Sequence, residues 1–266
     1  RLGSVLGSHM AIITFLTDSG ESDHYVAAMK AKILGINPGL TIIDISNKIE
    51  PCDIAHGAYV LKSVYSDFPK GTVHLVGVDS SGNRDEIYLA LQLDDHFFVG
   101  VNNGLFGLIS DKTHQQVVEL NSINPIQTTF AEKDILAPAA AKLASGVAIT
   151  TLGNPLQSYR KMINRQVKAT RRIIAGHVLR VDNFGNLITT INKVDFDILT
   201  KGRSYTIQFG GEKFRRIHTN YNQTEQGECF LLFNSQDLLE IGIYKGNASE
   251  LLGLQYDSPV NITFDE

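Results

Sequence analysis

Cysteine is scarce in this chain of 266 residues, which contains only Cys52 and Cys229. Two thiols so far apart in the sequence form neither a metal knuckle nor a disulfide framework by themselves. We interpret both as ordinary semi-buried thiols, because free cysteine usually behaves as a small hydrophobic residue. So few cysteines fit a reducing compartment, and we expect a cytoplasmic protein.

An excess of charge of one sign is also missing. Lys, Arg, Asp and Glu make up 20% of the residues and the formal net charge is -4, so no basic surface for nucleic acid is expected. No apolar run approaches the roughly 20 residues that span a bilayer, and no secretory signal begins at Met10. We therefore expect neither a nucleic-acid nor a membrane partner, and a small molecule is the favoured ligand.

Two common ligand motifs are absent as well. No predicted strand is followed by a Walker loop or by a Gly-x-Gly-x-x-Gly turn, which disfavours phosphate-binding alternatives. The histidines lack metal-ligand spacing, and no metal site is expected. Residues 1–9 place Gly-Ser-His before Met10 and resemble the remnant of an expression tag, so they are left out of the fold prediction.

The first half of the chain alternates between strand and helix patterns. Short apolar runs at 11–17, 41–45 and 73–78 are separated by two segments with helical spacing. This alternation predicts right-handed crossovers and an α/β domain with a mainly parallel sheet over residues 10–153. A hairpin is also expected within 86–101.

The second half has a different pattern. Residues 154–172 are polar and basic and are predicted to be a linker. Beyond them, over residues 173–266, short β-type runs alternate with turn residues, which predicts a smaller all-β domain, barrel-like or a sandwich. With 43% hydrophobic residues, the chain can bury a core in each of two domains.

Several acidic residues stand where ligands bind in α/β proteins, at the carboxyl ends of strands. Asp18 follows the first predicted strand and Asp79 the third, and Asp23 lies across a glycine-containing loop from Asp18. A carboxylate in such a loop can accept two hydrogen bonds from a ribose diol. The alternative is that Asp18 only caps its own loop.

An ordered series of motifs runs from Met10 to the C-terminus. It comprises Thr17-Asp18-Ser19-Gly20, Val78-Asp79 with Arg84, Asn102-Asn103-Gly104-Leu105-Phe106, Phe130 to Ala141, Asp182-Asn183-Phe184-Gly185-Asn186, Phe233-Asn234-Ser235 and Gly246-Asn247-Ala248. The series resembles the S-adenosyl-L-methionine (SAM) hydroxide adenosyltransferase, or SAM hydrolase, family, whose relatives are the fluorinases and chlorinases. Phe-Gly-Asn by itself is equally an ordinary hairpin turn.

The resemblance implies roles for individual residues. Asp79 and Arg84 would hold a water or hydroxide for attack, since a carboxylate orients and partly deprotonates water and a guanidinium stabilises the hydroxide. The alternative is a turn-capping Asp79 with a solvated Arg84. Substrate contacts are expected from both halves of the chain: Asp18, Asp23, Asn103, Thr129, Phe130, Asp182, Phe184, Asn186, Tyr221, Ser235, Asn247 and Ala248. Of these, Asp182 would pair with the ligand's ammonium group and Phe184 would help to enclose the purine, whereas Tyr221 is equally explained as a core or interface residue.

The sequence departs from the family pattern at positions that are expected to hold the attacking water. The pattern Phe-His-Gly-Arg-Asp-x-Phe-Ala-Pro-Ala-Ala-Ala has histidine where this chain has Ala131. The loop from Asp79 to Arg84 is also two residues shorter and lacks Pro-Gly. Glu132 is the nearest titratable replacement and is assigned a catalytic role, although a glutamate that only favours the helix dipole is an equal alternative.

The expected function is hydrolysis in which water displaces L-methionine from the 5′ carbon of SAM and leaves adenosine. The resemblance implies no metal or organic cofactor and a homotrimer with sites at subunit interfaces. A protein that binds SAM or adenosine with little turnover is the alternative, because Ala131 cannot move a proton. Halogenation is disfavoured, since carboxylates at Asp79 and Glu132 would repel a halide.

Overall fold

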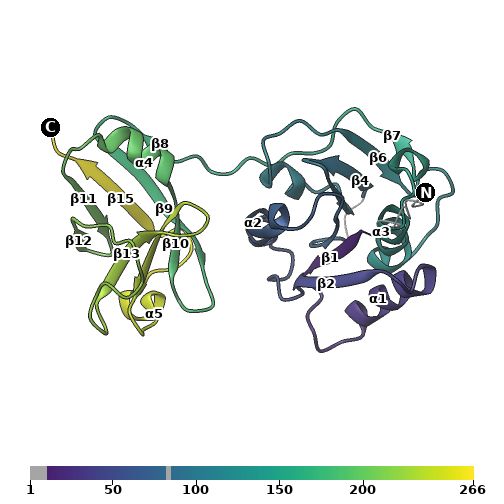
Figure 1. The fold of residues 1–266 in the computed structure, drawn as a ribbon, viewed down its shortest axis with the longest axis horizontal. Helices are drawn as coiled ribbons and strands as arrows, with labels where there is room; N and C mark the ends of the chain where they lie inside the picture. The colour runs from purple at the N-terminus through teal and green to yellow at the C-terminus, as the bar shows by residue number, and fades with distance from the viewer. Residues whose placement is uncertain (1–10, 82–84) are drawn as a thin grey trace, which may run out of the picture. The chain divides into compact units, whose positions relative to one another are not determined.

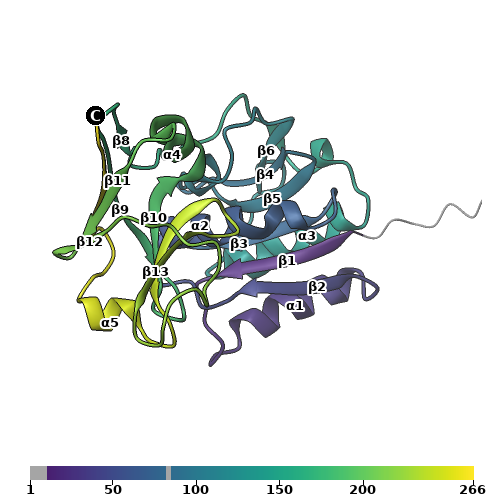
Figure 2. The same ribbon diagram turned by 60° about the vertical axis from the view of Figure 1, so that its left-hand side comes forward.

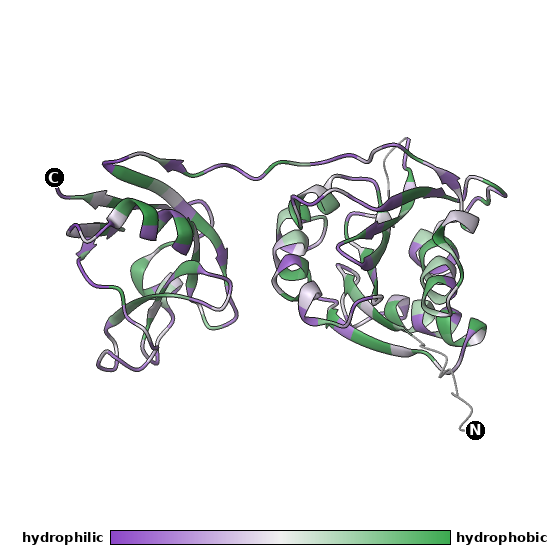
Figure 3. Ribbon diagram, turned by 45° about the horizontal axis from the view of Figure 1, so that its top comes forward, coloured by the Kyte–Doolittle hydropathy of each residue, from purple (hydrophilic) through white to green (hydrophobic). Residues whose placement is uncertain are grey.

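The computed structural model describes residues 11–81 and 85–266. The chain divides into two compact units, residues 1–164 and 165–266, and each is described by itself. In Figure 3 the strands and helices carry most of the hydrophobic colour and the loops most of the hydrophilic colour. Among the described residues, no helix combines the length and apolar character that a membrane crossing would need.

Unit 1 contains a seven-stranded sheet in the order β2-β1-β3-β5-β4-β6-β7 (Figure 1). Its strands are β1 (Ile12–Thr17), β2 (Thr41–Ser46), β3 (Val73–Gly77), β4 (Tyr88–Leu93), β5 (His96–Val101), β6 (Gln116–Leu120) and β7 (Asn154–Pro155). Its helices are α1 (Tyr25–Ile36), α2 (Ile54–Val64) and α3 (Ala137–Ala144), with short turns of helix at Tyr65–Asp67, Leu105–Leu108 and Ile149–Thr151. A π-helical turn at Glu132–Leu136 leads directly into α3.

The sheet is mixed, so the prediction of a mainly parallel sheet is wrong. The pairs β1–β2, β1–β3 and β3–β5 are parallel, whereas β4–β5, β4–β6 and β6–β7 are antiparallel. The hairpin expected within 86–101 is present as β4 and β5, and its turn residues Asp94 and Asp95 have positive φ angles of 52° and 60°. A two-residue turn can only join antiparallel strands.

Both faces of this sheet are covered. Alternation along β1 sends Phe15 into a core with α1 and α3 and Leu16 into a second core with α2. The helix α2 begins at Asp53, whose side chain accepts a hydrogen bond from the His56 amide. In Figure 2 the arrows of β1 and β2 end at the same edge of the sheet. Because β3 pairs in parallel with β1, Asp18 after β1 and Asp79 after β3 follow strand ends at this same edge.

Unit 2 is a curled antiparallel sheet around one core. Its strands are β8 (Lys168–Ala169), β9 (Ile173–Val181), β10 (Leu187–Asn192), β11 (Tyr205–Phe209), β12 (Glu212–Phe214), β13 (Cys229–Phe233), β14 (Leu238–Ile243) and β15 (Pro259–Phe264). Two short helices, α4 (Lys193–Thr200) and α5 (Ala248–Leu252), begin at Asn192 and Asn247, whose side chains each accept an amide hydrogen bond. All pairings between these strands are antiparallel, as an all-β domain of short strands predicts.

Candidate functional site

The Asp18 carboxylate joins three loops at the carboxyl edge of the parallel strands. Asp18 Oδ2 accepts hydrogen bonds from the main-chain amide of Cys52, at 2.9 Å, and from that of Asp79, at 3.0 Å. Cys52 lies in the loop after β2 and Asp79 in the loop after β3. One carboxylate oxygen therefore fixes the loops of three neighbouring strands against each other.

Both amide donors belong to residues with left-handed backbone. The φ angle is 61° at Cys52 and 50° at Asp79. For a residue other than glycine this conformation costs about 1–2 kcal/mol, and such strain persists where surrounding contacts impose it. A side-chain hydrogen bond with Asp79 is also the main reason why the pKa of the Cys52 thiol is raised. The hydrogen bond from the Asp79 amide to Asp18 thus helps to hold Asp79 in this conformation.

The predicted loop-capping role of Asp18 is present, and it leaves one oxygen for a ligand. Among residues 11–81 and 85–266, no hydrogen bond to Asp18 Oδ1 is found. Asp23 lies in the same loop and is exposed. The sequence offered the two roles of Asp18 as alternatives, but the two carboxylate oxygens allow both.

The next three residues predicted to bind substrate, which differ in their contacts, are Asn103, Thr129 and Phe130. Asn103 is buried, and its Nδ2 donates to the Val78 carbonyl at 2.9 Å, directly before Asp79. Asn103 therefore supports the Asp79 loop. Phe130 meets the ring of Tyr25 edge to face, with centroids 5.6 Å apart, and Thr129 beside it is exposed.

Glu132 lies over the ends of β1 and β3. A Cβ atom at Gly77, the last residue of β3, would be 3.2 Å from Glu132 Cγ and 3.3 Å from Cγ2 of Thr17. The absence of a side chain at Gly77 therefore leaves space for the methylene groups of Glu132. Burial raises the pKa of the Glu132 carboxyl, and the charge of Asp18 raises it further. The alternative of an exposed glutamate that only favours the helix dipole does not describe this side chain.

Ser80 is buried beside this carboxyl with its hydroxyl unused. Its exposed fraction is 4%, and in the described part of the chain Oγ lacks a partner that meets hydrogen-bond geometry. Its weaker interaction with Glu132 still offsets part of the rise in the pKa of that carboxyl. A buried hydroxyl without a partner is a position where an ordered water or a ligand is expected.

Two other positions that were expected near the attacking water are Ala131 and Arg84. Ala131 is only 5% exposed and packs in the core of α1 and α3. Arg84 lies outside the described residues. Of the predicted catalytic set, the structure therefore places Asp79 and Glu132.

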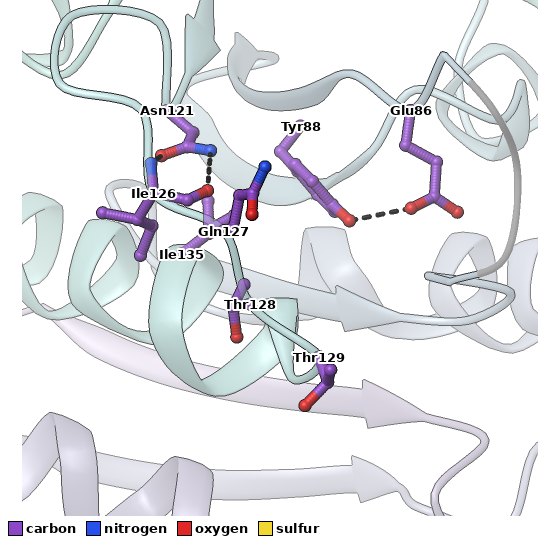
Figure 4. A pocket seen from close by; sticks show the side chains of 8 residues that line it. All are labelled: Glu86, Tyr88, Asn121, Ile126, Gln127, Thr128, Thr129 and Ile135. Carbon is purple, nitrogen blue, oxygen red and sulfur yellow. Dashed lines mark hydrogen bonds between the residues drawn. The ribbon is translucent and has the colours of Figure 1, made fainter.

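An open pocket of about 1030 Å³ lies in unit 1 (Figure 4). Its lining consists of Glu86, Tyr88, Asn121, Ile126, Gln127, Thr128, Thr129 and Ile135. The Tyr88 hydroxyl donates to Glu86 Oε2 at 2.8 Å. The charge of Glu86 acts on Glu132 and contributes to its raised pKa, and Ile135 belongs to the same π-helical turn. Glu86 is the acidic residue in this lining.

Asn186, a predicted residue of unit 2, is held by a buried glutamate that the sequence analysis missed. Glu240 on β14 is 4% exposed; its Oε1 accepts from Asn186 Nδ2 at 3.0 Å and its Oε2 from Asn234 Nδ2 at 2.9 Å. Burial raises the pKa of this carboxyl, and the two amides offset part of the rise. The signal in the sequence was a single acidic residue inside the apolar run of β14.

The loop between β9 and β10 is fixed on the same side. Asp182 Oδ1 accepts from the amides of Phe184 and Asn186, both at 2.9 Å. A Cβ at Gly185 would lie 2.1 Å from Asn247 Oδ1, so the Asn247 loop packs directly on this turn. The turn consequently needs glycine, whose φ angle here is 77°.

The remaining predicted residues of unit 2 differ in exposure. The Phe184 ring is 74% exposed at the tip of its turn, and Tyr221 is 47% exposed and packs edge to face on Phe230. Ser235 is exposed, whereas Ala248 is fully buried. Within the described residues, no three His, Cys, Asp or Glu side chains are grouped so as to hold a metal ion.

Comparisons with known proteins agree with the motif series. Residues 13–153 match the SAM hydroxide adenosyltransferase N-terminal domain and residues 176–261 the C-terminal domain. The (R)-S-adenosyl-L-methionine hydrolase of Methanocaldococcus jannaschii is 30% identical, with 95% of this chain and 96% of that protein covered. A fluorinase of Actinoplanes sp. is 24% identical over 70% of this chain and 73% of that protein.

Solved structures show the same likeness in three dimensions. The crystal structure of an uncharacterised conserved protein from Thermotoga maritima superposes with a TM-score of 0.85 at 29% identity, covering 95% of this chain and 100% of that one. A conserved hypothetical protein from Thermus thermophilus gives a TM-score of 0.75 at 27% identity, covering 96% of this chain and 100% of that one. With both family domains matched in order, the chain belongs to the SAM hydroxide adenosyltransferase family.

Proposed function

We propose that this protein hydrolyses SAM to adenosine and L-methionine. The observation that carries the proposal is the fixed carboxylate pair at the strand edge, in which Asp18 Oδ2 holds the Asp79 amide at 3.0 Å. Relatives that share 27–30% identity over nearly the whole chain are named (R)-S-adenosyl-L-methionine hydrolases. The sulfonium epimer in that name is the substrate form to test first.

In the proposed reaction, a water oxygen attacks the 5′ carbon while the bond from that carbon to sulfur breaks. The electron pair stays on sulfur, so methionine leaves as a neutral thioether and needs no acid to assist it. Asp18 Oδ1 accepts from the ribose hydroxyls, and Asp79 orients the water. Because the sulfonium is already a good leaving group, the proposal includes no metal and no organic cofactor.

The residues of unit 2 are proposed to recognise the two ends of the substrate. Asp182 would pair with the methionine ammonium and Phe184, exposed at its turn, would cover the purine. The Asn186 side chain is hydrogen-bonded to Glu240, and the Asn247 side chain packs on the turn at Gly185. Each would therefore contact a ligand in a fixed orientation. Fixed donors lose little conformational entropy on binding.

The test is to incubate the protein with each sulfonium epimer of SAM and to measure adenosine and methionine by chromatography. Equal amounts of the two products, above the uncatalysed background, support the proposal. Binding of SAM without product would favour the second candidate, a SAM- or adenosine-binding protein. That candidate is favoured by Ala131, whose side chain is buried and cannot transfer a proton.

Halogenation remains the least favoured reaction, although fluorinases are among the relatives. The Glu132 carboxyl is partly buried beside Asp18, and an anion entering this region would be repelled by both charges. The same assay with fluoride or chloride should give no 5′-halogenated nucleoside.

We also propose a homotrimer with its sites at subunit interfaces and a cytoplasmic location. The support for the assembly is the family resemblance, together with ligand-binding residues expected in both units. Light scattering at several concentrations tests it, and a stable monomer that still binds SAM would contradict it.

A further inference from the structure

We propose that Glu132 accepts the proton of the attacking water, in the role that the family pattern gives to histidine. The inference rests on the proposed hydrolysis and adds the group that completes it. Water becomes a strong nucleophile only as its proton is removed, and a positioned side chain typically contributes roughly 100- to 10,000-fold to such a step. Ala131 cannot supply that group.

The position of Glu132 is the first argument. Its stem packs over Gly77, two residues before Asp79, and beside Thr17, the residue before Asp18. Its carboxyl is close enough to Asp18 for that charge to act on it. The acceptor thus lies at the edge where the proposed ribose ligand and the water-orienting residue are held together.

Ser80 supplies an independent argument. Its buried hydroxyl has no hydrogen-bond partner among the described residues and lies beside the Glu132 carboxyl. Buried polar atoms in native proteins are normally paired with protein or ordered water. A water between Ser80 and Glu132 would satisfy both groups and would stand within reach of a proton acceptor.

Burial and nearby charges change the pKa of the Glu132 carboxyl. Burial, Asp18 and Glu86 raise the pKa of its carboxyl, whereas its own backbone and Ser80 lower it. The neighbouring phenol of Tyr88 and thiol of Cys52 also have raised pKa values and stay protonated at neutral pH. A general base works best when its pKa lies near the working pH, and a raised pKa makes the Glu132 carboxylate a stronger base.

The proposed step balances without another reactant. The bond from oxygen to the 5′ carbon forms, the bond from that carbon to sulfur breaks, and the electron pair leaves with methionine. The proton moves from the water oxygen to a Glu132 carboxylate oxygen and is then released to solvent.

The experiment compares the wild type with Glu132→Gln and Glu86→Gln, measuring kcat from pH 4 to 9 and SAM affinity by calorimetry. Glu132→Gln keeps the shape and removes the base, so kcat should fall roughly 100-fold or more while SAM affinity changes little. In the wild type, kcat should fall as acid protonates Glu132, and this acidic limb should be missing in Glu132→Gln. Glu86→Gln removes a neighbouring charge and keeps an oxygen that can accept from the Tyr88 hydroxyl. In this variant the acidic limb should move to lower pH and the kcat plateau should be retained.

A further variant keeps the test decisive if Glu132→Gln does not fold. Ser80→Ala removes the interaction that lowers the pKa of Glu132, so the acidic limb should move to higher pH. If the wild type makes adenosine but its limb stays in place in Ser80→Ala and Glu86→Gln, or if Glu132→Gln keeps full kcat, the assignment of Glu132 is overturned and the hydrolase function stands. If the wild type makes no adenosine, the proposed function itself fails.

Discussion

The main-chain amide of Asp79 donates to Asp18 Oδ2 at 3.0 Å, and the amide of Cys52 donates to the same oxygen at 2.9 Å. Asp18, a residue predicted to bind ligand, is therefore also a residue that shapes the loop of Asp79 after β3. The two tasks fall on different oxygens of one carboxylate, which makes them separable by substitution.

Asp18→Ala should weaken SAM and adenosine by similar factors, because the ribose is common to both ligands. Loss of one charged acceptor typically costs about 1.5–3 kcal/mol, or roughly 10- to 150-fold in affinity. Asp18→Asn keeps an oxygen for the Cys52 and Asp79 amides and should retain the loop while losing part of the affinity. Calorimetry with both ligands measures this, and an unchanged adenosine affinity in Asp18→Ala would remove the ribose assignment.

Asp79→Asn should lower kcat by roughly 100-fold or more with little change in melting temperature. Asparagine tolerates the left-handed backbone found at this position, where φ is 50°, so the variant removes the charge without adding strain. Asp79→Val is the matched opposite, since a β-branched residue is strained at positive φ and should lower the melting temperature as well. Equal kcat in wild type and Asp79→Asn would show that this carboxylate does not orient the water.

Glu240→Leu should destabilise the protein and weaken SAM binding. The substitution leaves the Asn186 and Asn234 amides without their acceptor in a buried site, at about 1–3 kcal/mol for each unsatisfied group. Glu240→Gln keeps one amide acceptor and should have an intermediate effect. Urea unfolding and calorimetry measure the two effects; a Glu240→Leu protein as stable as wild type would mean that the amides find other partners.

The sequence was sufficient to predict that Asp18 and Asp79 meet. Each follows an apolar run in an alternating α/β pattern, and β1 and β3 do pair in parallel. The hairpin of β4 and β5 was also predicted, but no strand was predicted at β6 or β7, and their antiparallel pairing helps to make the sheet mixed.

Contacts set by tertiary packing were beyond the sequence pattern. The Cys52 amide reaches Asp18 only because residue 52 adopts a positive φ angle of 61°, which is rarely predicted for cysteine. Glu240 was likewise missed, because its two amide partners come from the turn before β10 and from the turn before β14, and no local motif joins them. Burial of Glu132 could also not be read from its place at a helix start.

Unfolding free energy should fall as the pH drops from 6.5 toward 3, because of His74. This ring is fully buried; its Nδ1 lies 2.6 Å from Thr14 Oγ1 and its Nε2 lies 3.1 Å from His96 Nδ1. Burial, with a smaller contribution from His96, lowers the pKa of His74 to about 3. Between the two pKa values, His74 binds a proton in the unfolded chain but not in the folded chain. This contribution to the free energy of unfolding is therefore complete above pH 6.5 and is lost at about 1.4 kcal/mol per pH unit below it.

Urea unfolding at pH 7.5, 6 and 5 measures this slope, and this range keeps the titration of ordinary carboxyls small. His74→Gln is the matched variant, since glutamine can hydrogen-bond to Thr14 and His96 but does not titrate. Its absolute stability should be lower, yet its loss of stability between pH 6 and 5 should be smaller by about 1 kcal/mol, because one titrating proton is gone. The pKa values of His96 and His177 are also lowered and contribute to both proteins, so the difference between the two slopes belongs to His74. Identical slopes would mean that His74 accepts its proton in the folded state.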